Sequence, residues 1–405
     1  MLRAVLALPR TVWLLGLVSL FNDSTSELVY PLVPLFLASV LMAGPRALGL
    51  IEGVAEATAS LLKLFSGVLM DKRGHAKGWV AGGYGLAAFS RPLFYLATSW
   101  PAVLVLRFAD RVGKGLRTSP RDAMLAGAVD KDRRGLAFGL HRAMDNAGAV
   151  IGPLLAALLL ARGMPLKDVF LWSVVPGIIT VILALSIKEP PVVPAANRQL
   201  FSWKMAGFPP VYKRYLLVLA LFTLGNSSNM FLLLRAKELG LPDYQVPLLW
   251  ALVSGVAMVF SMPLSALSDR IGRVRLILAG WIVYGLFYLL LGLNGFHAVL
   301  LWPLFAFYGL FLAATEGAEK ALVADLAPRN QLGTAYGWFN LTAGFMLLPA
   351  SILFGWLWQG VAVEAAFGFS ASCALLAALL LEFWVMRAQP AGGQAAACPP
   401  ATGKE

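Results

Sequence analysis

The sequence predicts an all-α polytopic membrane protein with twelve transmembrane helices arranged as two six-helix halves. Hydrophobic residues make up 59% of the 405 residues and charged residues only 13%, and the mean hydropathy is +0.74. A soluble protein of this length needs much more polar surface. Apolar runs long enough to cross a bilayer recur along the whole chain, and clusters of cations separate them.

The first half is expected to occupy residues 1–187. Its N-terminal stretch, MLRAVLALPRTVWLLGLVSLF, begins like a secretory signal peptide. It lacks a small-residue cleavage site, however, and its apolar character resumes after NDSTSE, so we expect it to be retained as the first helix. Runs bounded by Gly, Pro or charge give six helices, at 11–41, 46–70, 78–98, 101–126, 135–161 and 167–187.

The second half is expected at 213–390, after a linker at 188–212 that is polar, basic and rich in Pro. The same criteria give six further helices, at 213–238, 244–267, 275–294, 298–324, 332–358 and 362–386. We expect residues 391–405 to form a disordered cytoplasmic tail.

Cations occur in alternate loops of this arrangement. One set of loops contains Lys72, Arg73, Lys77, Lys131, Arg133, Arg134, residues 188–214, Arg270, Arg273, Arg275 and Arg329, whereas the other contains chiefly Arg46, Arg162 and Lys167. The positive-inside rule then predicts that both termini and the linker are cytoplasmic. The same rule accounts for the formal net charge of +12, so we expect no nucleic-acid partner.

An internal repeat supports the division into halves. DKRGHAK, from Asp71, aligns with DRIGRVR, from Asp269, at an offset of 198 residues. RGLAFGLH, from Arg134, aligns with LGTAYGWF, from Leu332, at the same offset. Two separate segments that share one offset indicate two related six-helix units and a pseudo-two-fold axis.

With these features, the chain resembles a major facilitator superfamily transporter over essentially its full length. The stretch GVLMDKRGHAK (67–77) resembles the loop motif G-x-L-x-D-R-x-G-R-K of that superfamily, although His75 and Ala76 replace basic residues. RFADRVGKG (107–115) resembles the fourth-helix motif R-x-x-Q-G-x-G, with Asp110 in place of Gln and Arg111 in place of the first Gly. Three further segments, around residues 19–37, 49–60 and 110–125, resemble a bacterial subgroup of the superfamily.

The resemblance implies a fold, a location and several residue roles. It implies alternating access in a bacterial inner (plasma) membrane by a chain that works as a monomer. GAVIGPLLAA (148–157) resembles the fifth-helix motif of proton-coupled antiporters through Gly148, Gly152 and Pro153, although small residues at such positions also serve plain helix packing. From the family we also expect gating roles for Asp71, Arg73, Asp269 and Arg270.

A charged stripe on the fourth helix is the strongest candidate for a functional site. At 100° per residue, its members fall within roughly 140° of one another. They are Arg107, Asp110, Arg111, Lys114, Arg117, Arg121 and Asp122. Charge at mid-membrane costs about 2.5–3.5 kcal/mol per residue, so we expect the outer and central part of the stripe to line a substrate cavity. Arg117 to Asp122 could instead be a solvated helix end with snorkelling cations.

Other ionisable residues inside predicted helices supply countercharges. Asp23 and Glu27 share a face of the first helix, and with Asp145 of the fifth they are our candidates for proton coupling. Glu52 and Glu56 of the second helix and His141 and Arg142 of the fifth are further cavity candidates. The tenth helix carries the gating candidates Glu316, Glu319 and Lys320.

The repeat also predicts a latch between the fourth and tenth helices. The offset of 198 pairs Arg121 with Glu319 and Asp122 with Lys320, with the signs of charge reversed. We expect these pairs to close the cytoplasmic mouth when the cavity opens outward. Arg117, Arg121 and Asp122 of the fourth helix would then act as gating residues that face the tenth helix. The alternative is two independent surface pairs.

The sequence contains no G-x-x-x-x-G-K-[ST] motif and no predicted soluble domain that could bind ATP, so transport is passive or gradient-driven. Its two cysteines do not form a metal-binding spacing, and we expect no enzyme activity, cofactor or metal. Proton-coupled export of a small molecule is the first hypothesis. The alternatives are import or facilitated diffusion of an anionic metabolite and a membrane sensor that does not transport.

Overall fold

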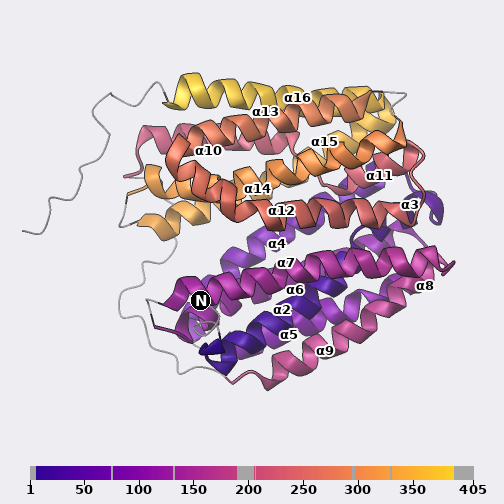
Figure 1. Cartoon of the computed structure of the whole chain (residues 1–405), viewed down its shortest axis with the longest axis horizontal. Coiled ribbons are helices and arrows are strands. Elements are labelled where there is room, and N and C mark those ends of the chain that lie inside the picture. The colour runs from indigo at the N-terminus through magenta and orange to yellow at the C-terminus, as the bar shows by residue number, and fades with distance from the viewer. Residues whose placement is uncertain are drawn as a thin grey trace, which may run out of the picture.

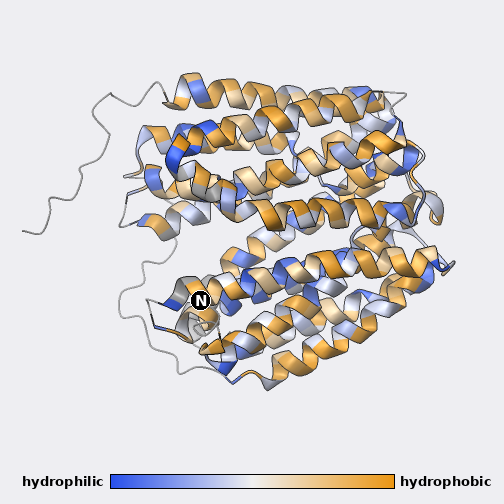
Figure 2. Cartoon of the chain, viewed as in Figure 1, coloured by the Kyte–Doolittle hydropathy of each residue, from blue (hydrophilic) through white to orange (hydrophobic). Residues whose placement is uncertain are grey.

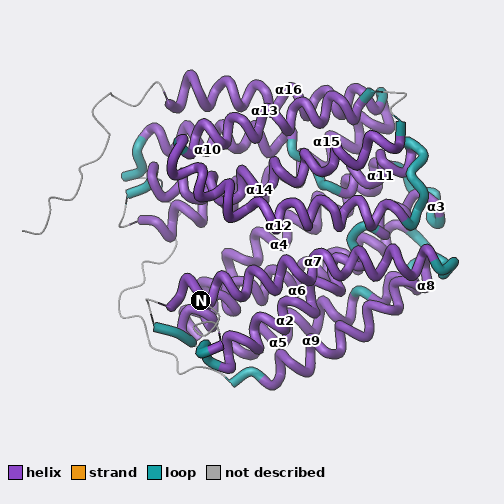
Figure 3. Tube along the Cα trace, in the orientation of Figure 1, coloured by secondary structure: helices purple, strands orange, loops and turns teal. Residues whose placement is uncertain are grey.

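The computed structural model describes residues 6–73, 76–130, 133–188, 205, 207–293, 297–328 and 331–386. Within these ranges the chain is helical and contains no β-strand (Figure 3). Most of the linker expected at 188–212 and all of the tail expected at 391–405 lie outside the described residues.

The first six predicted spans are all helical. Their helices are α2 (Arg10–Val29), α3 (Leu32–Ser39), α4 (Pro45–Arg73), α5 (Ala76–Ser90), η1 (Pro92–Leu96), α6 (Trp100–Gly127), α7 (Arg134–Ala161), α8 (Leu166–Val169), η3 (Phe170–Ser173) and α9 (Val174–Ser186). Apart from the breaks described below, the predicted bounds agree with these helices to within a few residues.

The last six spans are helical as well. They comprise α10 (Pro210–Gly225), α11 (Met230–Glu238), α12 (Gln245–Ile271), α13 (Arg273–Gly292), η4 (Ala298–Leu300), α14 (Leu301–Leu326), α15 (Leu332–Gly360), α16 (Val363–Leu380) and the π-helical η6 (Leu381–Met386). Eight described helical stretches, the fifth to twelfth spans, are long and apolar enough to cross a membrane. The first four spans are shorter, broken or more highly charged.

The first span of each half is broken near its middle, a feature that the apolar runs did not predict. Pro31 separates α2 from α3, because a proline has no N–H with which to continue the helical hydrogen bonds. Residues 226–229 separate α10 from α11, and Asn226 leaves the helical conformation there (φ −95°, ψ 76°). Adding the repeat offset to position 30, next to Pro31, gives 228, so the two breaks are equivalent positions of the two halves.

The termini define the two ends of the molecule. The described chain begins and ends on the left in Figure 1, where α2 and α10 start and α9 stops; we call this the terminal end. The opposite, far end holds α3, α8 and α11 (Figure 1). Hydrophobic residues predominate along the helices, with hydrophilic residues at their ends and inside the first half (Figure 2).

The two halves contact each other mainly through α4 against α15 and α7 against α12, and α3 meets α11 at the far end. Glycines allow the closest approach. A methyl group added at Gly49 on α4 would collide with the carbonyl oxygen of Ser351 on α15, and one at Gly355 would collide with that of Pro45. The halves are therefore tightly joined toward the far end.

Candidate functional site

A buried ion-pair network lies on the far-end half of α6. Arg107 donates from Nε and Nη2 to the carboxylate of Glu52 on α4, at 2.5 and 3.2 Å. It also lies 3.4 Å from Asp110, one turn further along α6. All three side chains are at most 2% exposed. A buried charge without a countercharge is strongly destabilising. The three side chains therefore stabilise one another in the membrane interior by compensating each other's charge.

Two further arginines extend this network on either side. Arg91, which follows the last residue of α5, donates from Nε to Asp110 at 2.9 Å and from Nη1 to the backbone and side chain of Asn22 on α2. Arg111 lies 2.9 Å from Glu56, one turn after Glu52 on α4. The stripe predicted on the fourth helix is therefore largely compensated by carboxylates within its own half.

Two carboxylates of the first half accept hydrogen bonds from the second half. Ser228, in the break between α10 and α11, donates to Glu52 at 3.0 Å. The indole of Trp250 on α12 donates to Glu27 at 2.8 Å and also packs against the ring of Tyr30, with centroids 5.2 Å apart. Glu52 and Glu27 thus link the interior of one half to the other.

Asp23 and Asp145 bring two carboxyl groups together between α2 and α7. The two groups lie within hydrogen-bonding reach of each other. Ser19 donates to Asp145 at 2.5 Å, and Asn22 donates to Asp23 at 2.7 Å. Two negative charges this close repel strongly in a medium of low dielectric constant, so the pair is suited to share one proton.

The glycines of the antiporter-like motif set this carboxyl pair in place. A methyl group at Gly148 on α7 would collide with the carbonyl oxygen of Leu20 on α2, and one at Gly152 would collide with that of Ser24. The two helices therefore pack backbone to backbone one turn beyond Asp145. In the structure, Gly148 and Gly152 act as packing residues, and Pro153 lies beside them inside α7.

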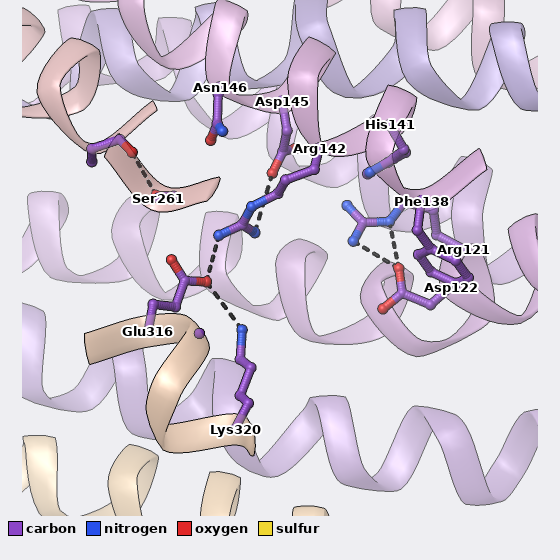
Figure 4. Close-up of a pocket in the computed structure, with 12 residues that line it drawn as sticks. Arg121, Asp122, Phe138, His141, Arg142, Asp145, Asn146, Ser261, Glu316 and Lys320 are labelled. Atoms are coloured by element: carbon purple, nitrogen blue, oxygen red, sulfur yellow. Dashed lines mark hydrogen bonds and ion pairs between the residues drawn. The ribbon is translucent and has the colours of Figure 1, made fainter. Parts of the chain in front are cut away.

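A pocket of about 410 Å³ lies between the halves, lined by residues near the terminal-end portions of α6, α7 and α14 (Figure 4). Helices α6 and α7 form one wall, and α12 and α14 the other. The lining residues are Arg121, Asp122, Phe138, His141, Arg142, Asp145, Asn146, Ala257, Ser261, Glu316, Gly317 and Lys320. Asp145 joins the pocket to the carboxyl pair, and the buried Nε2 of His141 has no hydrogen-bond partner among the described residues.

One ion pair crosses this pocket. Arg142 on α7 pairs with Glu316 on α14, and it also lies 3.8 Å from Asp145 (Figure 4). Lys320 pairs with Glu316 at 3.0 Å. The side chains of Arg142 and Glu316 are 54% and 47% exposed, so solvent weakens the bridge and it can exchange partners at low cost.

The predicted latch is not formed in this conformation. Arg121 pairs instead with its neighbour Asp122 at 2.8 Å, and Glu319 accepts a hydrogen bond from Trp281 within its own half. The latch was expected only when the terminal end is closed, whereas here a pocket is open at that end. The gating role of these residues therefore stays a prediction.

Several predicted residues have no observed role in the site. The side chains of Asp71, Arg73 and Asp269 lie outside the described part of the structure, and Arg270 is exposed in the last turn of α12. Lys114 and Arg117 form no ion pair with any described residue. Arg117 is nevertheless buried and stacks over the ring of Tyr84 at 4.4 Å.

Sequence reasoning missed four contributors to the network: Arg91, Asn22, Ser228 and Trp250. Arg91 could have been found, because it is a single cation inside the apolar run GLAAFSRPLFYL. The other three are neutral. The contacts of Ser228 and Trp250 depend on how the halves meet, and that of Asn22 depends on how α2 lies against the end of α5. Among the described residues, no group of three or more His, Cys, Asp or Glu could hold a metal ion.

Comparison with protein families agrees with this architecture. The family model of the Major Facilitator Superfamily matches residues 12–261 and 215–397. An uncharacterised MFS-type transporter of Methanocaldococcus jannaschii is 35% identical over 386 residues, which is 93% of this chain and 95% of that protein. The multidrug resistance protein MdtH of Salmonella newport is 24% identical over 348 residues, 82% of each chain.

Solved structures share the fold at low sequence identity. A POT family transporter in complex with 5-aminolevulinic acid has a TM-score of 0.79 at 12% identity. The match covers 94% of this chain and 97% of that transporter's chain. The nucleoside transporter NupG has a TM-score of 0.73 at 14% identity, with coverage of 92% and 98%. At these identities the likeness concerns the fold alone.

Proposed function

Since this chain belongs to the major facilitator superfamily, we propose that it exports a small molecule in exchange for protons, with the Asp23–Asp145 carboxyl pair as the proton site. The membrane is a bacterial inner membrane with both termini in the cytoplasm, so the pocket of Figure 4 faces the cytoplasm. The loop charges support this orientation. The multidrug resistance relatives support export.

The observation that carries this proposal is the position of the carboxyl pair. It connects α2 to α7, and its Asp145 lines a pocket between the halves. A proton on the pair removes the repulsion between two carboxylates. Loss of that proton adds a negative charge to the pair, which Arg142 or a bound substrate can compensate. Proton binding and substrate binding thus compete at one place, as exchange requires.

Glu27 remains a second candidate for the coupling group. Its hydrogen bond with Trp250 joins the halves and must break when they separate at this level. A change of its charge would act on the conformational equilibrium, whereas a change at Asp23 or Asp145 would act on the shared proton directly.

The proposal is tested in proteoliposomes with a panel of candidate substrates, each with and without an imposed pH gradient. We expect the gradient to drive accumulation of a substrate by the unmodified protein and not by Asp23→Asn or Asp145→Asn. Asp130→Asn changes an exposed carboxylate in the loop after α6; it is the matched control and should retain full transport. Equal gradient-driven transport by all four proteins would refute the proton site.

The second candidate function is uptake of an anionic metabolite. It rests on Lys114 and Arg117, the cations of the stripe that no described carboxylate neutralises, because an incoming anion could pair with them. Substrate levels in cells that lack the protein, together with transport kinetics in proteoliposomes, separate the two functions. Import predicts that loss of the protein lowers the internal level of an anionic substrate and that Lys114→Gln raises the KM for that substrate.

A further inference from the structure

A second cavity, of about 460 Å³, opens between the halves at the far end. We call it the far-end groove. Its residues include Arg46 and Leu50 of α4, Trp100 at the start of α6, and Ile352, Trp356 and Gln359 of α15. The groove therefore has one wall in each half and lies where α4 and α15 pack together.

The far-end groove faces the lipid. On α15, Phe345, Leu353 and Trp356 share one helix face and are 53%, 41% and 61% exposed. Exposed apolar residues on a membrane-spanning helix contact acyl chains. Trp356, which belongs to this exposed face, also lines the groove. The apolar part of the groove, between Leu50 of α4 and Ile352 and Trp356 of α15, suits an acyl chain better than water, because water there would lack hydrogen-bond partners.

Among the described residues that line the groove, Arg46 is the single cation. Arg46 lies in the first turn of α4, and its guanidinium sits 4.6 Å from the centre of the Trp356 ring across the interface. Arg and Trp at helix ends mark the boundary between acyl chains and headgroups. Arg46 forms no ion pair with a described residue, so its charge is available to an external anion.

From this arrangement we infer that the far-end groove binds one anionic phospholipid. Its phosphate pairs with Arg46, and an acyl chain runs between Leu50 and Ile352. The side-chain oxygen of Gln359 already accepts the backbone N–H of Arg46 at 3.2 Å, which leaves its amide N–H groups free to donate to the headgroup. Because the lipid contacts both halves, it stabilises the conformation that is closed at the far end. This inference requires only that the chain spans a membrane, and it is independent of the transported substrate.

Native mass spectrometry on the full-length protein tests the inference. The protein is released from nanodiscs of phosphatidylcholine that contain a minor fraction of phosphatidylglycerol, and retained phosphatidylglycerol is counted. We expect one tightly retained molecule on the unmodified protein and on Arg162→Ala, whose arginine is exposed at the same end outside the groove. Arg46→Ala should lower its occupancy about tenfold or more, and Arg46→Lys should lower it less.

Two further measurements distinguish a bound phospholipid from a site that takes only a phosphate group. Ile352→Trp keeps the cation but fills the acyl path, and it should also lose the retained lipid. Soluble glycerol phosphate in excess should not displace the lipid, because the groove recognises the chain as well as the phosphate. Retention that is equal in Arg46→Ala and the unmodified protein, or displacement by glycerol phosphate, would overturn the inference.

Discussion

Glu52 is the residue at which an ion pair inside one half meets a hydrogen bond from the other. It is 1% exposed, it receives two hydrogen bonds from Arg107, and it accepts one from Ser228. Opening the far end must separate Ser228 from Glu52. The bond inside the half can persist, so we expect Glu52 to keep its countercharge during such a change.

The buried Arg107–Glu52 pair should be far more sensitive to single substitutions than the exposed Arg142–Glu316 pair. Glu52→Gln or Arg107→Met alone leaves one buried charge uncompensated and should cost about 3–5 kcal/mol of stability, whereas the double variant should recover much of this loss. Arg142→Ala should cost less than about 1 kcal/mol. Thermal unfolding in detergent measures all four. Additive losses in the double variant would contradict the pairing.

Of the stripe predicted on the fourth helix, Arg107, Asp110, Arg111 and Arg117 are buried, whereas Lys114 is exposed and Arg121 and Asp122 are partly buried. A helical period and the cost of charge in lipid thus predict the buried part of the stripe. The sequence did not predict how those charges pair. Glu52 could have faced Arg107, Arg111 or the other half, and only the rotation and depth of α4 relative to α6 decide between these neighbours. Arg121 shows the same limit, since its partner here is Asp122 and not Glu319.

Among the helices, the contact of α2 with α7 determines the geometry of the carboxyl pair. Gly148 and Gly152 remove side chains from the contact, and the backbones approach until Ser19 can donate to Asp145. The motif was visible in the sequence, but its role as a spacer between these two helices was not, because the motif does not identify the helix against which it packs.

Enlarging Gly148 should therefore damage coupling, whereas enlarging Gly139 on the same helix should not. A methyl group at Gly139 meets no described atom of another element within 4 Å, whereas one at Gly148 meets α2. We expect Gly148→Val to cost about 1–3 kcal/mol and to abolish pH-driven transport in protein that still inserts. Gly139→Val should change neither quantity. Unaltered transport by Gly148→Val would show that the spacing of α2 and α7 does not matter for coupling.

For the whole molecule, hydropathy, loop charge and the repeat were enough to predict twelve helices in two halves. The breaks at Pro31 and at residues 226–229 were not predicted, since both lie inside continuous helical spans of the predicted arrangement. The conformational state was not predictable either. One sequence serves every state of the cycle, and the difference between states lies in contacts between the halves.

The proposed orientation of the whole chain rests on loop charge alone. A single cysteine placed at position 196, in the linker, should react with a membrane-impermeant maleimide only after the cells are opened. A single cysteine placed at position 162, which follows α7 at the far end of the molecule, should react in intact cells. For both measurements the two native cysteines are first replaced by serine. Labelling of position 196 from outside intact cells would reverse the proposed topology.

The latch predicted between α6 and α14 concerns the closed terminal end. Arg121→Glu should shift the population toward the conformation of Figure 4 by removing an attraction to Glu319 in the other state. Adding Glu319→Arg should partly restore the balance. A double-mutant cycle on terminal-end accessibility measures the coupling. Strict additivity would mean that Arg121 and Glu319 never meet.

The central claim is that Asp23 and Asp145 share one proton inside the membrane. Infrared difference spectroscopy across a pH titration detects that proton directly, through the C=O stretching band of a protonated carboxylic acid, and it needs no substrate. We predict one such band in the unmodified protein and in Asp130→Asn that is absent or shifted in both Asp23→Asn and Asp145→Asn. A band that is unchanged in both aspartate variants would place the proton elsewhere and contradict the claim.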